Sequence, residues 1–191
     1  MGLAREFAYR NFIGIDIKGA RMWAGAKEAH LAGMVNVGFL RTDISLLESF
    51  FAPGEVSEIW ITFPDPQMKK TRKRLTATNF LEMYRRILAP DGIVNLKTDS
   101  PFLYTYTSRL VDLNGLPTLA NTADLYSDPT YSGNPLLNIR THYEKQWLAR
   151  GKQIKYLAFQ LPQDIELQEP EADDIPLDDY RSYGRNYNTD D

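Results

Sequence analysis

The feature of this sequence that most limits its fold is the alternation of short apolar runs with segments of helical periodicity. The apolar runs predict six strands, and four segments with apolar residues every three or four positions predict helices between them. The predicted strands are residues 11–17, 35–40, 58–63, 92–97, 117–122 and 154–161, and the predicted helices are residues 19–33, 78–89, 100–115 and 141–150. Such alternation predicts an α/β fold, with a mostly parallel sheet and helices on both faces.

An aspartate stands at or just after the end of each of the first four predicted strands. These residues are Asp16, Asp43, Asp65 and Asp99. Ligands of open α/β sheets bind beyond the carboxyl ends of the strands, so all four are candidate site residues. Asp16 suits the ribose hydroxyls of a nucleoside cofactor, or is a solvated strand end. Asp43 suits an amino group such as adenine N6, or caps the turn that follows it.

Asp65 has an unusual setting, because Pro64 and Pro66 flank it. Each proline fixes its own φ and restricts the residue before it, which predicts a stiff carboxylate at the end of an apolar strand. Five cations follow within six residues, and these are Lys69, Lys70, Arg72, Lys73 and Arg74. A run of charge is usually a solvated surface. Beside a candidate site it indicates contact with an RNA backbone instead.

The net charge of −3 hides an asymmetry along the 191 residues. Residues 164–191 hold ten acidic and two basic side chains, which leaves twenty basic and fifteen acidic side chains in residues 1–163. We therefore predict a mildly basic folded domain over residues 1–163, followed by an acidic and poorly packed tail over residues 164–191.

Composition removes several classes of protein. The chain has no cysteine, which excludes disulfides, thiolate metal sites and cysteine nucleophiles, and with only two histidines we predict no metal site. No apolar run is long enough to span a bilayer, and the first residues do not resemble a signal peptide. We therefore expect a cytoplasmic protein with no membrane partner, whose oligomeric state the sequence does not indicate.

Four segments, taken in order, resemble the motifs of the bacterial tRNA (guanine-N7-)-methyltransferase family over residues 2–162. They are Phe12–Ile17, Phe63-Pro-Asp-Pro66 with its basic follower Lys69–Arg74, Leu96–Asp99, and Thr141–Glu144. The resemblance implies a Rossmann-like class I methyltransferase fold, S-adenosylmethionine as cofactor and tRNA as partner. The implied reaction is methylation of N7 of guanine-46 in the tRNA variable loop.

The resemblance also implies roles for individual residues. Asp65 becomes the catalytic residue, with Asp16, Asp43 and Asp65 as cofactor-binding residues. The substrate contacts implied are Lys69, Asp99, Thr141 and Glu144, and the RNA-backbone contacts predicted are Lys70, Arg72, Lys73 and Arg74. Thr141 and Glu144 also fit a capping box at a helix start, and the sequence does not rank the two interpretations.

The sequence departs from the family pattern in three places. Gln67 stands where an aromatic residue is expected, and the basic segment is shorter. The glycine-rich cofactor loop and its strand are absent, and residues 1–7 resemble the middle of the helix that follows that loop. We therefore predict a sheet without its first central strand, either through truncation or through a late gene start, and weakened cofactor binding.

Two other functions fit parts of the sequence. A non-catalytic tRNA- or RNA-binding protein would use the basic segment without the missing loop. A nicotinamide-dependent oxidoreductase would use Asp16 on a ribose, but it leaves the Pro64–Pro66 segment without a role.

Overall fold

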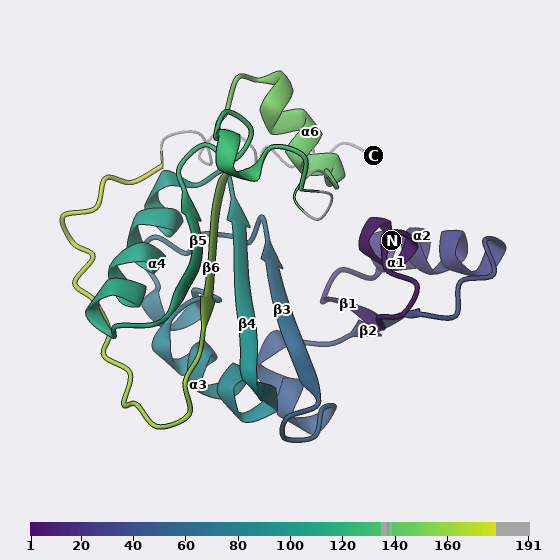
Figure 1. The fold of residues 1–191 in the computed structure, drawn as a ribbon, viewed down its shortest axis with the longest axis horizontal. Coiled ribbons are helices and arrows are strands. Elements are labelled where there is room, and N and C mark those ends of the chain that lie inside the picture. Colours follow the sequence, from purple (N-terminus) through teal and green to yellow (C-terminus); the bar gives the residue numbers. More distant parts are fainter. Residues whose placement is uncertain (135–136, 138, 179–191) are drawn as a thin grey trace, which may run out of the picture.

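The strands of the computed structural model, which describes residues 1–134, 137 and 139–178, form two sheets (Figure 1). The first pairs β1 (Phe12–Asp16) with β2 (Val37–Arg41). The second contains, in spatial order, β3 (Val56–Thr62), β4 (Leu88–Thr98), β6 (Lys155–Gln160) and β5 (Thr118–Thr122). All six predicted strands are present.

The pairing confirms the predicted α/β class. β1 and β2 are parallel, as are β3 and β4, whereas β6 is antiparallel to both β4 and β5. Within the described residues no strand joins β1 to β3 by hydrogen bonds. The two parallel pairs therefore belong to different sheets.

Each of the two sheets has its own helices packed beside it (Figure 1). α1 (Gly2–Glu6) and α2 (Gly19–Leu31) lie beside β1 and β2, and α3 and α4 cover one face of the larger sheet. α6 lies beyond the carboxyl ends of β3 and β4. The remaining bounds are α3 (Thr78–Ile87), α4 (Pro101–Leu113), α6 (His142–Ala149), and the 3₁₀ turns η1 (Ile44–Ser49), η2 (Thr71–Lys73) and η3 (Pro129–Tyr131). Among the described residues, no helix has the length and apolar character needed to cross a bilayer.

Local sequence explains where α4 begins, but not where α3 ends. The Ser100 hydroxyl accepts a hydrogen bond from Leu103 N at 3.0 Å, and Pro101 fills the first turn of α4, as predicted. The predicted helix over 78–89 and strand over 92–97 are wrong at their shared boundary, because α3 ends at Ile87 and β4 already starts at Leu88. The β3–β4 pairing has a register shift here, with Leu88 opposite Val56 and Ile93 opposite Glu58. The irregular stretch therefore lies in β4, and strand pairing overrides the local helix signal.

The two faces of the larger sheet bury different clusters. On β4, Val94 and Leu96 point to α3 and α4, where Leu81, Tyr84 and Leu103 are almost fully buried. Successive strand residues point to opposite faces, so the neighbours of Val94 and Leu96 face the other way. That second face carries a smaller cluster, whose buried members are Leu125, Leu137, Ile154, Tyr156 and Ala158.

Residues 162–178, here called the C-terminal strap, run back across α3 and α4. Ile175 is 4% exposed and belongs to the main core. Arg85 donates to the carbonyls of Pro162 at 3.2 Å and Ile165 at 2.5 Å, and Arg109 pairs with Asp174 at 2.6 Å. The prediction of poor packing is therefore wrong for residues 164–178. The rest of the predicted tail, residues 179–191, lies outside the described residues, and the domain boundary at 163 stays a prediction.

Candidate functional site

Two of the strand-end aspartates lie on the smaller sheet. Asp16 is the last residue of β1 and is half-buried, and its Oδ1 accepts a hydrogen bond from Lys18 N at 2.9 Å. Asp43 is exposed, and its Oδ1 accepts from Ser45 N at 2.9 Å and from Ser45 Oγ at 2.7 Å. The structure thus gives Asp43 the capping role, at the start of η1. Both carboxylates are held by local bonds at the carboxyl end of a strand.

The bonds from Ser45 also lower the pKa of Asp43, and the nearby Lys73 ammonium adds to that effect. Lys73 belongs to the basic segment that follows β3, so this segment reaches the end of the smaller sheet. The carboxyl ends of β2 and β3 are therefore neighbours in space, although no strand among the described residues links the two sheets.

The loop of residues 63–70, here called the β3 loop, holds Asp65 in an exposed position. Phe63 and Gln67 have positive φ values of 51° and 48°, and Phe63 N donates to Lys97 O at 2.8 Å. Gln67 N donates to Asp65 Oδ1 at 3.1 Å, which orients the carboxylate. Left-handed residues other than glycine are uncommon and concentrate at functional sites. The geometry supports the interpretation of Asp65 as a carboxylate on a restrained backbone, held in one orientation.

The basic segment divides into exposed and buried cations. Lys69, Lys70, Arg72 and Lys73 are exposed, whereas Arg74 is 2% exposed. The Arg74 guanidinium lies over the ring of Phe102 at 4.8 Å and that of Tyr106 at 4.5 Å. It donates to Gln67 O at 3.2 Å and Met68 O at 2.7 Å. Arg74 therefore supports the β3 loop from inside, and its placement does not suit the predicted contact with RNA.

Asp99 directly follows β4 and is 1% exposed. It stands next to Ser100, the N-cap of α4, at the same end of the sheet as the β3 loop. Burial lowers the pKa of the nearby Lys155 ammonium, and the carboxylates of Asp99 and Asp178 act against that change. A buried carboxylate, Asp99, and a buried cation, Lys155, therefore lie close together at this end of the sheet.

A second charged pair lies fully inside the protein. Lys97 Nζ and Glu144 Oε1 are 2.7 Å apart, and their side chains are 3% and 0% exposed. Tyr126 donates to the same Glu144 oxygen at 2.5 Å, and Lys97 also donates to Leu137 O at 2.9 Å. Burial lowers the pKa of Lys97, against the pull of Glu144, and burial raises the pKa of the Tyr126 hydroxyl. This cluster fastens α6 and the loop before it to β4.

Thr141 and Glu144 form the capping box that the sequence allowed. Thr141 N donates to Glu144 Oε2 at 3.0 Å, and Glu144 N donates to Thr141 Oγ1 at 3.1 Å. Sequence analysis missed Lys97 and Tyr126 as members of this cluster. A signal was present, because a lysine within a buried apolar strand needs an anionic partner.

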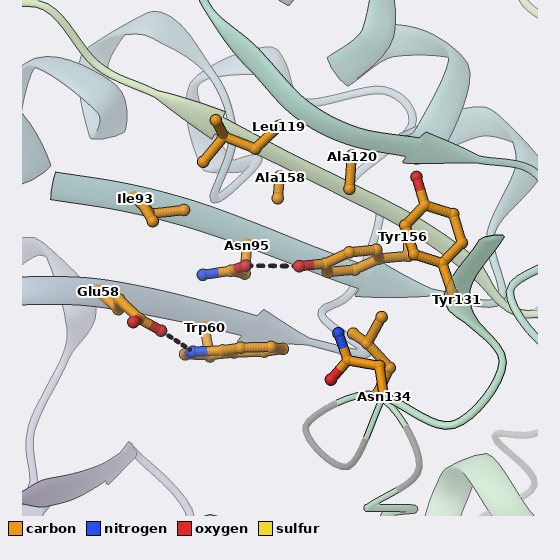
Figure 2. A pocket seen from close by; sticks show the side chains of 11 residues that line it. Glu58, Trp60, Ile93, Asn95, Leu119, Ala120, Tyr131, Asn134, Tyr156 and Ala158 are labelled. Atoms are coloured by element: carbon orange, nitrogen blue, oxygen red, sulfur yellow. Dashed lines mark hydrogen bonds between the residues drawn. The ribbon is translucent and has the colours of Figure 1, made fainter. Parts of the chain in front are cut away.

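A cavity of about 240 Å³ lies on the sheet face that points away from α3 and α4 (Figure 2). Trp60 stacks with Tyr156 at 6.2 Å between ring centroids, and Tyr131 meets Tyr156 edge-on at 6.1 Å. The Tyr156 hydroxyl, whose pKa burial raises to about 12, donates to Asn95 Oδ1 at 2.8 Å. No predicted site residue lines this cavity.

Comparisons with known proteins agree with this architecture. A family model described as "Putative methyltransferase" matches residues 1–157. The tRNA (guanine-N(7)-)-methyltransferase of Porphyromonas gingivalis is 61% identical over 186 residues, which cover 97% of this chain and 75% of the relative. The protein of the same name from Bacteroides thetaiotaomicron is 57% identical and is covered to 72%, again with 97% of this chain.

Solved structures show the same fold at low sequence identity. A putative sarcosine dimethylglycine methyltransferase from Galdieria sulphuraria superposes with a TM-score of 0.51 at 15% identity, over 85% of this chain and 74% of that one. Geranyl diphosphate C-methyltransferase from Streptomyces coelicolor gives a TM-score of 0.50 at 16% identity, over 83% of this chain and 67% of that one. Given the family model and the extent of these matches, the chain belongs to the tRNA (guanine-N7-)-methyltransferase family.

Proposed function

We propose that this protein transfers the methyl group of S-adenosylmethionine to N7 of a guanine in tRNA, and that the guanine is position 46 of the variable loop. The observation that carries the proposal is the exposed carboxylate of Asp65 on a constrained loop, followed at once by four exposed cations. Family membership supports the reaction, since the relatives matched over most of the chain bear the name of this activity. The cytoplasm is the compartment that we propose for it.

Asp16 and Asp43 fit the nucleoside part of the cofactor. Both are carboxylates at strand ends, and carboxylate oxygens accept hydrogen bonds from ribose hydroxyls and from an adenine amino group. The bonds that Asp16 and Asp43 receive from Lys18 and Ser45 hold each carboxylate in one orientation. When bound, S-adenosylmethionine supplies an electrophilic methyl group on a sulfonium.

The reaction places a limited demand on the protein. Guanine N7 carries an in-plane lone pair and no proton, so it forms the new bond to the methyl carbon directly. The bond from carbon to sulfur breaks with its electrons remaining on sulfur, and no proton has to move. Positioning and electrostatic stabilisation therefore provide the rate enhancement.

Asp65 and Asp99 are the residues that we assign to the guanine. A carboxylate that accepts from N1–H and N2–H identifies the base and stabilises the positive charge that methylation leaves on the purine. The base has to leave its stack to reach these carboxylates. Thr141 belongs to the same proposed substrate surface, and Glu144 supports it through the capping box.

The decisive measurement uses methyl-labelled cofactor and unmodified tRNA, with 7-methylguanine identified after digestion and its position mapped by strand cleavage. We expect Asp65→Ala to abolish methyl transfer while tRNA affinity stays within about twofold, because the cations hold the RNA. Asp112→Ala is the matched control, since Asp112 is an exposed carboxylate at the far end of α4. Full activity of Asp65→Ala would remove Asp65 from the mechanism.

Other outcomes separate the alternatives. Methylation at a different guanine would keep the reaction and overturn position 46. A protein that binds tRNA but produces no 7-methylguanine would be a non-catalytic RNA-binding protein. Calorimetric binding of a nicotinamide cofactor without binding of S-adenosylmethionine would favour an oxidoreductase.

The basic segment has its own test. Replacing Lys69, Lys70 and Arg72 together by alanine should weaken tRNA binding and reduce the slope of log K against log salt by about 2, at about 0.7–0.9 per phosphate contact. Lys27→Ala is the control, because Lys27 is an exposed lysine on α2. An unchanged slope would contradict the proposed RNA contacts.

A further inference from the structure

The C-terminal strap reaches the candidate site at Asp178, which is the last of its described residues. This side chain is 7% exposed, and its carboxylate accepts hydrogen bonds from Phe102 N at 3.0 Å and from the Ser100 hydroxyl. Its backbone N–H donates to Met68 Sδ at 3.1 Å. One residue therefore contacts both the amino end of α4 and the β3 loop.

The rest of the strap holds Asp178 in this place. Glu169 accepts hydrogen bonds from Thr78 N at 3.1 Å and Thr78 Oγ1 at 2.8 Å, and from the Tyr106 hydroxyl. Further along, Ile175 is buried in the main core. Asp178 thus follows a packed segment and lies three residues after a core side chain.

The two elements that Asp178 joins carry the residues assigned to the guanine. Met68 lies three residues after Asp65 in the β3 loop, and Ser100 is adjacent to Asp99. We propose that Asp178 is a positioning residue for the tRNA site, which fixes the β3 loop against the amino end of α4. This inference rests on the proposed function, because it assigns a role within the same site.

The charge of Asp178 adds to its geometric effect. A carboxylate at a helix amino terminus interacts favourably with the unpaired N–H groups and the helix dipole. Asp178 also acts on the Lys155 ammonium together with Asp99. Loss of this charge would weaken the attachment of Asp178 to the amino end of α4, and through it the contact of the Asp178 backbone with the β3 loop. It would also alter the electrostatic environment of Asp99.

Three variants separate positioning from simple stabilisation. Asp178→Asn keeps the shape and removes the charge, and Asp178→Glu keeps the charge. Asp174→Asn is the matched control, because Asp174 lies on the same strap and pairs with Arg109 at the surface. The measurements are the kcat and KM for tRNA, the Kd of the tRNA complex, and hydrogen exchange of the amides of residues 67–70.

We expect Asp178→Asn to raise the KM and Kd for tRNA about threefold to tenfold and to speed exchange in the β3 loop, with kcat changed less. Asp178→Glu should recover most of the affinity, and Asp174→Asn should behave as the wild type. A fall in Tm with unchanged Kd and unchanged loop exchange would overturn the proposal. Equal effects of Asp174→Asn and Asp178→Asn would also overturn it, because the strap would then act only through stability.

Failure of the proposed function gives a different pattern. If the wild-type protein produces no 7-methylguanine, the reaction is refuted. The Kd for tRNA and the exchange of loop amides need no methyl transfer, so they still decide whether Asp178 positions the loop. Where tRNA does not bind at all, loop exchange alone decides.

Discussion

Replacing Glu144 by glutamine tests whether the buried pair with Lys97 holds α6 in place. The Glu144 carboxylate accepts from Lys97 Nζ at 2.7 Å, Tyr126 OH at 2.5 Å and Thr141 N at 3.0 Å. Glu144→Gln leaves the Lys97 ammonium at 3% exposure without its counter-charge. Breaking a buried pair from one side costs about 3–5 kcal/mol.

Urea unfolding followed by tryptophan fluorescence measures this cost. With a slope of about 2 kcal/mol per molar urea, the midpoint should fall by about 1.5–2.5 M. Lys97→Met should have a similar effect, because it leaves the Glu144 carboxylate buried alone. The double variant Lys97→Met/Glu144→Leu should cost less than the sum of the single variants, since neither charge is then left without its partner.

An exposed pair provides the control. Glu28 pairs with Arg5, and both side chains are 51% exposed. Glu28→Gln should therefore change the free energy of unfolding by less than about 1 kcal/mol. The reasoning fails if Glu144→Gln is equally mild. Loss of tRNA methylation by such a stable Glu144→Gln variant would mean that Glu144 acts on the substrate rather than on α6.

Three further variants test local features. Asp43→Ala should lower the free energy of unfolding by about 1 kcal/mol at neutral pH, because the cap is lost. The folded pKa of Asp43 is lowered, so the stability difference between wild type and variant should be present above pH 3.8 and vanish as the pH falls through the folded pKa. Urea midpoints measured at each pH follow this difference. Gly92→Ala should lower Tm, because its Cβ would meet Ala89 O at 2.8 Å, whereas Gly38→Ala meets no atom within 4 Å and should be tolerated. Arg74→Lys should lose the stacked, forked contacts and destabilise by about 1–3 kcal/mol in urea unfolding, whereas Arg72→Lys at an exposed position should not.

Local patterns in the sequence predicted most helices and strands, because caps and apolar periodicity depend on residues that are neighbours in the chain. The Ser100 and Thr141 caps and the alternation in β4 are examples. The helix predicted to residue 89 ends two residues earlier, because Leu88 pairs with Val56 of β3, which lies more than thirty residues away in the sequence. Long-range pairing of this kind leaves no signal in a short window.

The candidate site could be predicted in part, for the same reason. Strand ends indicated where Asp65 and Asp99 lie, but a run of cations does not show which member turns inward, so Arg74 was assigned to RNA. The acidic composition of the strap suggested disorder, while Ile165 and Ile175 carry enough apolar surface to pack. The role inferred for Asp178 depends on its contact with Ser100, which lies more than seventy residues earlier in the chain, and no local motif indicates such a contact.

The division into two sheets has a consequence for the local unfolding of the protein. Among the described residues no backbone ladder connects β1–β2 to β3–β6, so each unit can have its own free energy of local unfolding. Asp16 and Asp43 belong to one unit, and Asp65 and Asp99 to the other. A ligand that touches both units links them, and its binding raises the protection of the smaller unit against exchange by RT ln(1 + [L]/Kd). Amide protection in β1 and β2 then reports directly on how much of the site is occupied.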